Sequence, residues 1–319
     1  MLIAVVGDCL LDVVVRPRGP MRAGGDTPAR VRLGPGGQGA NVAVRLARRG
    51  ASVRLIAPLA DDAGARLLRD VLSREAVDLA PLGAARTGSV VALLDEHGER
   101  SMLSDRVTPD PGELAGLLDG AGWVHCSGYL LRDEGGVRPL LDALVGRPQG
   151  ARLSVAGGSI PPDPVLAAAF LDRVRAAGCD LLIASRDEAA ALVGATADAP
   201  SLAGQLAERL PSCLVLVTAG SDGSSAAGPG IPPFAVPAAA LPGSPLDTTG
   251  AGDAFSAALI DELAHLGTWP PPITELHRAM ASASLLGARV ARVTGAQTPV
   301  SGEATPGLDD EPQRSSERG

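Results

Sequence analysis

The sequence predicts an α/β fold in which helices cover both faces of a mainly parallel sheet, and three observations carry this prediction. Residues 2–6, Leu-Ile-Ala-Val-Val, form a continuous apolar run of the kind found in strands buried on both faces. The second half of the chain alternates short apolar runs with longer helical patterns. Finally, 45% of the 319 residues are hydrophobic, which supports a large core and excludes a chain disordered throughout.

In the first half of the chain we expect two strands, two helices and two exposed flaps. The strands are predicted at residues 2–6 and 53–57, and the helices at 40–49 and 62–73. The first helix has an apolar side, so Arg48 and Arg49 are expected to face solvent. Residues 11–32 mix short apolar pieces with Pro, Gly and Arg, which suits a flap, and residues 89–94 and 100–103 flank the polar stretch 95–99 as a hairpin would.

The second half of the chain alternates more regularly. Strands are predicted at residues 123–126, 152–155, 181–184 and 213–218, and helices at 165–177, 187–193, 202–209 and 254–263. Residues 301–319 lose all apolar periodicity and gain Asp, Glu, Pro, Ser and Arg, so we expect a flexible C-terminal tail there.

Composition excludes several classes of function. The chain carries a net charge of -8, with 28 basic residues, all of them arginine, against 36 acidic ones. Such a chain is a poor candidate for binding nucleic acid or an anionic membrane. The absence of lysine excludes a P-loop lysine, a Schiff base and a Ser-Lys pair. No apolar run reaches the length of a membrane span.

Cysteine and histidine give no sign of a metal site or a disulfide framework. The 4 cysteines are widely spaced and never form C-x-x-C, which indicates structural thiols in a reducing compartment, so the expected location is the cytoplasm. The 4 histidines lack the spacing of metal ligands.

The strongest local signal is the segment 247–255, Asp-Thr-Thr-Gly-Ala-Gly-Asp-Ala-Phe. Its small residues allow a tight turn with several amides pointing one way, and the helical pattern that follows places them at a helix N-terminus, which favours an anion. Asp253 makes sense there if it takes a proton from a hydroxyl that attacks a bound phosphate.

A second glycine-rich segment, residues 34–41, reads Gly-Pro-Gly-Gly-Gln-Gly-Ala-Asn. It satisfies G-x-G-x-x-G, with Asp61 and Asp62 about twenty residues on, so a dinucleotide site has to be weighed. The preceding residues 30–33 alternate and are half polar, however, whereas the first strand of a dinucleotide-binding fold is buried. Alternatively, the glycines bring backbone close to a polyhydroxylated ligand while Asn41 offers both a donor and an acceptor.

Together, residues 36–41 and 247–253 resemble the two signatures of the ribokinase family, also called PfkB carbohydrate kinases. The resemblance extends over residues 1–300 and implies a three-layer α/β/α ribokinase-like fold with a small β-sheet lid, formed by segments near 11–35 and 86–105. Residues 215–223 resemble the family's nucleotide-binding strand and loop, and residues 295–297, Gly-Ala-Gln, its closing loop. The implied activity is transfer of the γ-phosphoryl group of ATP to a hydroxymethyl group of a small sugar of the ribose, fructose or keto-deoxy class.

The resemblance also implies residue roles. Asp253 would be the general base, and the amides of Gly250, Ala251 and Gly252 the anion hole. Asp12, Gly37, Gly39 and Asn41 would hold sugar hydroxyls. The nucleotide would be lined by Ser185, Thr218, Gly220, Ser221, Gly223 and Gly252. Glu188 would help to hold Mg²⁺ through water, and Asp247 and Thr249 could contribute to a K⁺ site.

Three departures from the family pattern bear on the substrate. Ser185 stands where the family has Asn, and Gln38 stands where members that act on sugar phosphates often carry Lys, which disfavours a phosphorylated substrate. Near residues 127–130 there is no match for the acidic residue with which ribokinase itself contacts ribose, which disfavours ribose. Arg100 and Arg106, in or beside the expected lid, could reach the substrate.

Three alternative functions remain: a nucleoside kinase, a non-catalytic sugar-sensing protein and a dinucleotide oxidoreductase. A homodimer through the lid is expected.

Overall fold

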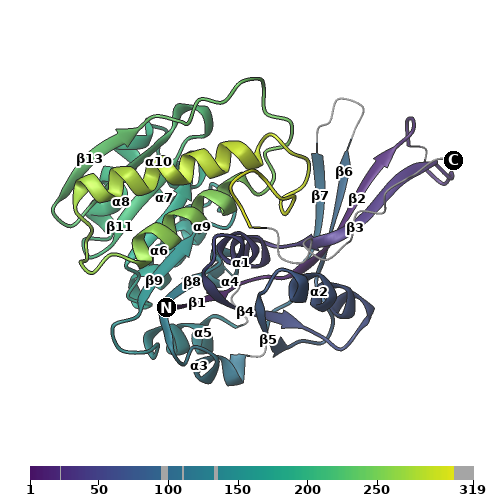
Figure 1. The fold of residues 1–319 in the computed structure, drawn as a ribbon, viewed down its shortest axis with the longest axis horizontal. Coiled ribbons are helices and arrows are strands. Elements are labelled where there is room, and N and C mark those ends of the chain that lie inside the picture. Colours follow the sequence, from purple (N-terminus) through teal and green to yellow (C-terminus); the bar gives the residue numbers. More distant parts are fainter. Residues whose placement is uncertain (22, 95–99, 110, 133–135, 305–319) are drawn as a thin grey trace, which may run out of the picture.

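The computed structural model describes residues 1–21, 23–94, 100–109, 111–132 and 136–304. Figure 1 shows two sheets: a large one sandwiched between helices and a smaller one that stands to one side of it. The large sheet has nine strands in the order β13-β12-β11-β10-β9-β8-β1-β4-β5. Their bounds are β1 Leu2–Val6, β4 Ser52–Leu59, β5 Asp78–Gly83, β8 Ala121–Cys126, β9 Arg152–Ala156, β10 Leu181–Ser185, β11 Leu214–Thr218, β12 Ser224–Gly228 and β13 Ile231–Val236.

In the large sheet the strands from β5 to β11 pair in parallel, whereas β12 pairs antiparallel with both β11 and β13, so β12 alone runs opposite to the other strands. Along β1, Ile3 and Val5 pack into one core cluster and Ala4 and Val6 into the other, because successive side chains of a strand point to opposite faces. Both faces of the sheet are therefore covered, which explains the continuous apolar run that predicted this strand.

Two layers of helices cover the sheet. One face is covered by α1 Gln38–Arg48, α2 Ala63–Arg74, α9 Ala251–Ala264 and α10 Ile273–Val290, with α9 and α10 packed against each other. The other face is covered by α3 Leu114–Leu117, α4 Gly128–Arg132, α5 Val137–Val145, α6 Pro164–Ala176, α7 Arg186–Val193 and α8 Ala199–Arg209. The expected three-layer α/β/α architecture is confirmed.

The smaller sheet, here called the lid sheet, has the order β3-β2-β6-β7. Its strands are β2 Leu10–Pro17, β3 Ala29–Gly36, β6 Ser89–Leu94 and β7 Arg100–Asp105. Antiparallel pairing joins β2 to β3 and β6 to β7, while β2 and β6 pair in parallel at the centre. The two flaps predicted from the sequence therefore meet in one sheet, and residues 95–99, at the predicted hairpin turn, lie outside the described residues.

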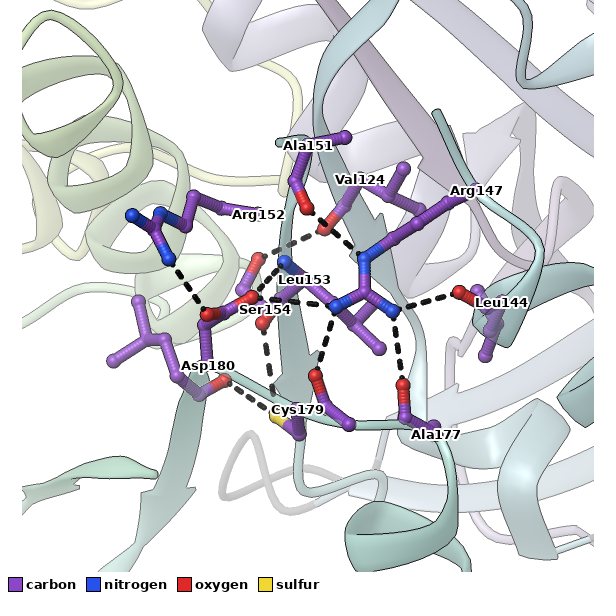
Figure 2. Close-up of polar contacts among 12 residues, drawn as sticks. Val124, Leu144, Arg147, Ala151, Arg152, Leu153, Ser154, Ala177, Cys179 and Asp180 are labelled. Atoms are coloured by element: carbon purple, nitrogen blue, oxygen red, sulfur yellow. Dashed lines mark hydrogen bonds and ion pairs between the residues drawn. The ribbon is translucent and has the colours of Figure 1, made fainter. Parts of the chain in front are cut away.

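At the edge of the large sheet where β9 and β10 begin, a polar cluster fastens the incoming loops (Figure 2). The guanidinium of Arg147 donates to the carbonyls of Leu144, Ala151 and Ala177 at 2.7, 3.0 and 3.0 Å. Asp180 accepts from the Leu153 amide at 2.8 Å and pairs with Arg147 at 3.5 Å. These contacts satisfy backbone groups where helices return to the sheet, away from the strand ends that carry the site described below.

The predicted elements match the structure to within a few residues, with omissions. Not predicted from the sequence were the strands β5, β12 and β13 and the helices α3, α4, α5 and α10, although Leu276, Met280 and Ala283 give α10 a helical period. The expected tail begins later than residue 301, because Ala304 donates its amide to the Arg48 carbonyl at 3.0 Å and the Glu303 carboxylate is buried. Residues 305–319 lie outside the described residues. Within the described residues, no helix combines the length and hydropathy needed to cross a membrane.

Candidate active site

The candidate site lies where the parallel strands of the large sheet end. Asp8 follows β1, Ser127 follows β8 and Thr218 ends β11, and the carboxyl ends of parallel strands share one edge of a sheet. The N-terminus of α9 meets this edge, because Asp253 in its first turn bonds to Asn41 of α1. Ligands bind at this edge in open α/β sheets.

The first turn of α9 has the geometry expected of an anion site. Gly250 caps the helix in the left-handed region, with φ 75°, and a Cβ there would lie 2.6 Å from the Cβ of Ala296. Only glycine fits this position without strain. The Ala251 amide donates to the Thr248 carbonyl at 3.2 Å, whereas the amides of Gly250 and Gly252 donate to no other described residue. Of the three amides expected to form the anion hole, those of Gly250 and Gly252 have no acceptor within the described residues, whereas that of Ala251 has one.

Asp253 is held by Asn41, whose Nδ2 donates to the Asp253 carboxylate at 2.8 Å. The pKa of Asp253 is raised to about 7, chiefly by burial. The Asn41 hydrogen bond and the charge of Arg45 lower this pKa, and the charges of Asp8 and Glu188 raise it further. A carboxylate with this pKa can accept a proton near neutral pH, as a general base must.

Asn41 was expected to hold a sugar hydroxyl, but its side chain is engaged at both ends within the protein. Its Nδ2 donates to Asp253, and its Oδ1 accepts from Gln297 Nε2 at 2.9 Å. The structure thus places Asn41 beside the candidate base, where it orients the carboxylate.

A cavity of about 560 Å³ adjoins the first turn of α9. Apolar groups dominate its wall, with Phe255 and Leu241 among them. Five of the residues predicted to line a nucleotide do line this cavity: Thr218, Gly220, Ser221, Gly223 and Gly252. Gly223 has φ 93° and its Cβ would lie 2.2 Å from the Val236 carbonyl, so this turn of the wall requires glycine.

Ser185, also predicted to contact the nucleotide, is not part of the cavity wall; it caps α7 instead. Its hydroxyl accepts from the Glu188 amide at 3.2 Å while the Glu188 carboxylate accepts from the Ser185 amide at 2.8 Å, which is a capping box. The other oxygen of Glu188 accepts from the Ser159 amide at 2.5 Å. Among the described residues, no group of three or more His, Cys, Asp or Glu side chains could enclose a metal ion.

The glycines of the second motif allow close backbone approach. Gly37 has φ 95°, and a Cβ there would lie 2.5 Å from the Asp8 carbonyl. A Cβ on Gly39 would lie 2.7 Å from the Cα of Gly7, so α1 begins in direct contact with the end of β1. Asp12, on β2 of the lid sheet, places its carboxylate over Gly36, where a Cβ would lie 2.1 Å from the carboxyl carbon.

A charged cluster beside these glycines joins Arg106, which the sequence suggested could reach the substrate, to Asp8, which was not predicted as a site residue. The buried Asp8 carboxylate forms an ion pair with Arg106, and the Arg106 guanidinium lies 3.6 Å from the centre of the Tyr129 ring. Ser127 donates to Gln38 Oε1 at 2.7 Å. Asp8, Arg106 and Tyr129 line a small cavity of about 30 Å³. Asp8 could have been predicted as a site residue because it closely follows the buried strand β1, whose carboxyl end lies at the ligand-binding edge of the sheet. The side chain of Arg100, the other arginine considered, is outside the described residues.

Asp247 joins two loops of the site. One carboxylate oxygen accepts from the Thr249 amide and hydroxyl at 2.9 and 2.5 Å, and the other accepts from the Gly295 amide at 2.9 Å. The two segments that resemble family loops, 247–253 and 295–297, are therefore neighbours.

The arginines of α1 are buried, which contradicts the solvent-facing expectation for Arg48. Arg48 donates to both carboxylate oxygens of Glu75 at 2.8 and 2.6 Å, and Arg45 forms a 2.6 Å ion pair with Glu303. Arg49 is partly buried and pairs with Asp261 at 2.8 Å. A local helical pattern cannot reveal partners that come from distant parts of the chain, and burial of an arginine requires such partners.

Comparison with known proteins gives a consistent result. The family model described as pfkB family carbohydrate kinase matches residues 1–302. A fructokinase from Klebsiella pneumoniae is 32% identical over 313 residues, covering 92% of this chain and 94% of that protein. The ribokinase structure from Thermotoga maritima superposes with a TM-score of 0.74 at 19% identity, covering 94% of this chain and 96% of the other. A Pyrococcus horikoshii sugar kinase in complex with ATP gives 0.72 at 22%, covering 93% and 95%. At these identities, the likeness to solved structures shows the fold.

Proposed function

This chain belongs to the pfkB family of carbohydrate kinases, and on that premise we propose how its own residues transfer the γ-phosphoryl group of ATP to a hydroxymethyl group of a small sugar. The observation that carries the proposal is the partly buried Asp253 carboxylate in the first turn of α9, beside the nucleotide-sized cavity, with a pKa of about 7. The other residues are assigned roles around this group.

Asp253 acts as the general base. The hydroxyl oxygen of the sugar bonds to the γ-phosphorus while the bond from phosphorus to the bridging oxygen breaks, and ADP leaves with that electron pair. The hydroxyl proton passes to the Asp253 carboxylate. The Asn41 hydrogen bond keeps the carboxylate turned toward the acceptor and lowers its pKa, so that more of it is ionised at neutral pH.

The transferred group is held at the start of α9. The free amides of Gly250 and Gly252 point at the charge that spreads over the phosphoryl oxygens, and the helix N-terminus adds a favourable field. The purine and ribose of ATP occupy the 560 Å³ cavity, whose largely apolar wall suits a base.

Glu188 holds Mg²⁺ through water in this proposal. Its oxygens already accept two backbone amides, and a carboxylate retains further lone pairs for a metal-bound water. This donor set fits an ion that keeps several waters and binds mainly to substrate phosphates. When bound, Mg²⁺ neutralises charge on the phosphates.

K⁺ is the second ion that we propose. Asp247 and Thr249 lie in a loop that the Asp247 carboxylate joins to Gly295, so oxygen-bearing residues of two loops lie close together there. Replacing K⁺ by choline in the assay should lower activity, and equal rates in both salts would remove this part of the proposal.

Free fructose is the first acceptor to test, because the Klebsiella relative is named a fructokinase. The substrate side offers Asp12 on the lid sheet, Gly37 and Gly39 in the α1 turn, and Asp8 beside them. The Asp8 charge is balanced by Arg106 and the neighbouring polar pair is Ser127 and Gln38, so the site favours a neutral, hydroxyl-rich ligand.

We also propose that two copies pair through their lid sheets in the cytoplasm. The register sets Val13 against Leu33 and Val15 against Val31, which makes one lid face apolar. Val31 is 56% exposed and Leu33 is 57% exposed. A second copy that packed against this face would bury these apolar side chains. All four cysteines are buried free thiols, which the reducing conditions of the cytoplasm would preserve.

The test is an assay of ADP release with Mg-ATP over free ketohexoses, aldoses, keto-deoxy acids and nucleosides, with and without K⁺. Turnover on fructose is the expected result. Turnover on a nucleoside alone would make this a nucleoside kinase. Sugar binding without ADP release across the panel would instead indicate a sensing protein on a kinase fold.

A further inference from the structure

A chain of three side chains leads from the loop after α10 to the candidate base. Gln297 Nε2 donates to Asn41 Oδ1 at 2.9 Å, and Asn41 Nδ2 donates to Asp253 at 2.8 Å. Asn41 itself is buried. A rotation of the Asn41 amide by about 180° exchanges its oxygen and its NH₂ group with little change in shape, and only one of the two orientations donates to Asp253. The contact that fixes this orientation therefore decides whether Asp253 receives the hydrogen bond.

We propose that Gln297 is a positioning residue, which holds the Asn41 amide in the orientation that donates to Asp253. This proposal rests on the function proposed above, since it gives Asp253 the role of base. With the Gln297 donor in place, the reversed Asn41 amide would set two N–H groups against each other and an oxygen against a carboxylate. Without Gln297, nothing else among the described residues donates to Asn41 Oδ1.

Gln297 can do this because its loop is held rigidly against α1. Three successive carbonyls, at residues 296–298, accept hydrogen bonds from arginines of α1. Those of Ala296 and Thr298 accept from Arg45 at 2.6 and 3.0 Å, and that of Gln297 accepts from Arg48 at 2.7 Å. Arg45 lies four residues after Asn41, hence on the same side of α1. Helix α1 thus carries both Asn41 and the arginines that hold the loop of Gln297 beside it.

The charges around Asp253 set the expected pH response. Asp8, after β1, and Glu188, in α7, raise its pKa, while Arg45, in α1, and the Asn41 hydrogen bond lower it. Loss of the Asn41 donor through loss of Gln297 would therefore move the pKa of Asp253 upward, and the acid limb of kcat/KM with it.

The chain offers an unusually direct probe, because Asn41 is its only asparagine. Selective ¹⁵N-asparagine labelling gives a single side-chain amide to follow through a pH titration. In the wild-type protein this signal should titrate with the midpoint of Asp253, and in Gln297→Met it should lose most of that response. Gln205→Met, on α8, is the matched control and should behave as wild type.

Activity provides the second readout. In Gln297→Met, kcat/KM for the sugar should fall about tenfold, the equivalent in rate of one hydrogen bond, with its acid limb moved to higher pH and KM for ATP unchanged. An unaltered Asn41 titration together with an unaltered pH profile would overturn the proposal. If the wild-type protein phosphorylates no sugar but Gln297→Met still abolishes the Asn41 titration, the positioning role stands and the proposed function fails.

Discussion

Asn41 and Asp253 are 212 residues apart in the sequence, yet their side chains meet at 2.8 Å at the junction of α1 and α9. Each belongs to one of the two motifs that predicted the site, so this contact joins the two motifs in one candidate active site. The contact also opposes desolvation, which raises the pKa of the partly buried Asp253 carboxylate to about 7, because the Asn41 hydrogen bond lowers that pKa.

The pH dependence of kcat/KM should follow Asp253. Burial raises its pKa to about 7, and the base must be ionised to act, so kcat/KM should fall about tenfold per pH unit below 7 and level off above it. In Asn41→Leu, which removes the donor that lowers this pKa, the acid limb should move to higher pH. If the acid limb of kcat/KM stays at the same pH in Asn41→Leu, a group other than Asp253 produces that limb.

Two glycines of the α9 turn should respond differently to alanine. Gly250→Ala puts a Cβ at φ 75° and 2.6 Å from Ala296, so it should cost about 2 kcal/mol or more of unfolding free energy. In Gly252→Ala the added Cβ meets nothing within 4 Å, so this variant should fold normally, but it should raise KM for ATP because Gly252 lines the cavity proposed to hold the nucleotide. Thermal unfolding and steady-state kinetics measure both, and equal stabilities would refute the strained-turn argument.

The Arg45–Glu303 ion pair should matter far more to stability than a surface pair. Both side chains are buried, with 0% and 1% exposed, so Arg45→Met leaves the buried Glu303 carboxylate with only a 3.8 Å contact to Arg48 as its charge partner and should cost about 3–5 kcal/mol. Arg74→Met breaks the Arg74–Asp70 pair, whose side chains are 70% and 63% exposed, and should leave stability nearly unchanged. Urea unfolding compares the two variants, and a small loss in Arg45→Met would mean that Glu303 takes another partner.

His125 should make stability fall on mild acidification. It is fully buried on β8, and burial lowers its pKa to about 4. Because the unfolded chain takes up the proton near pH 6.5 and the folded chain does not, stability is lost as pH falls from 6.5 to 4, by about 3 kcal/mol. Urea midpoints of wild type and His125→Asn across this range measure the effect, and parallel curves would contradict it.

Features that depend on neighbouring residues could be predicted from the sequence, whereas contacts between distant residues could not. The strand at residues 2–6 and the turn before Asp253 were predictable, since apolar runs, glycines and helix starts act over a few residues. The burial of Arg45 and Arg48 was not, because their partners Glu303 and Glu75 come from other elements. For the same reason the sequence did not show that Ser185 lies outside the cavity wall and caps α7 with Glu188, because its place relative to the cavity depends on packing.

The central claim is that Asp253 removes the proton from the sugar hydroxyl, and the most direct test compares binding with turnover in Asp253→Asn. This substitution preserves size and a polar contact with Asn41 but cannot accept the proton. Calorimetry should give a sugar affinity within about threefold of wild type, while kcat should fall by at least about 100-fold. A kcat within tenfold of wild type, or sugar binding lost together with turnover, would contradict the assignment of Asp253 as the base.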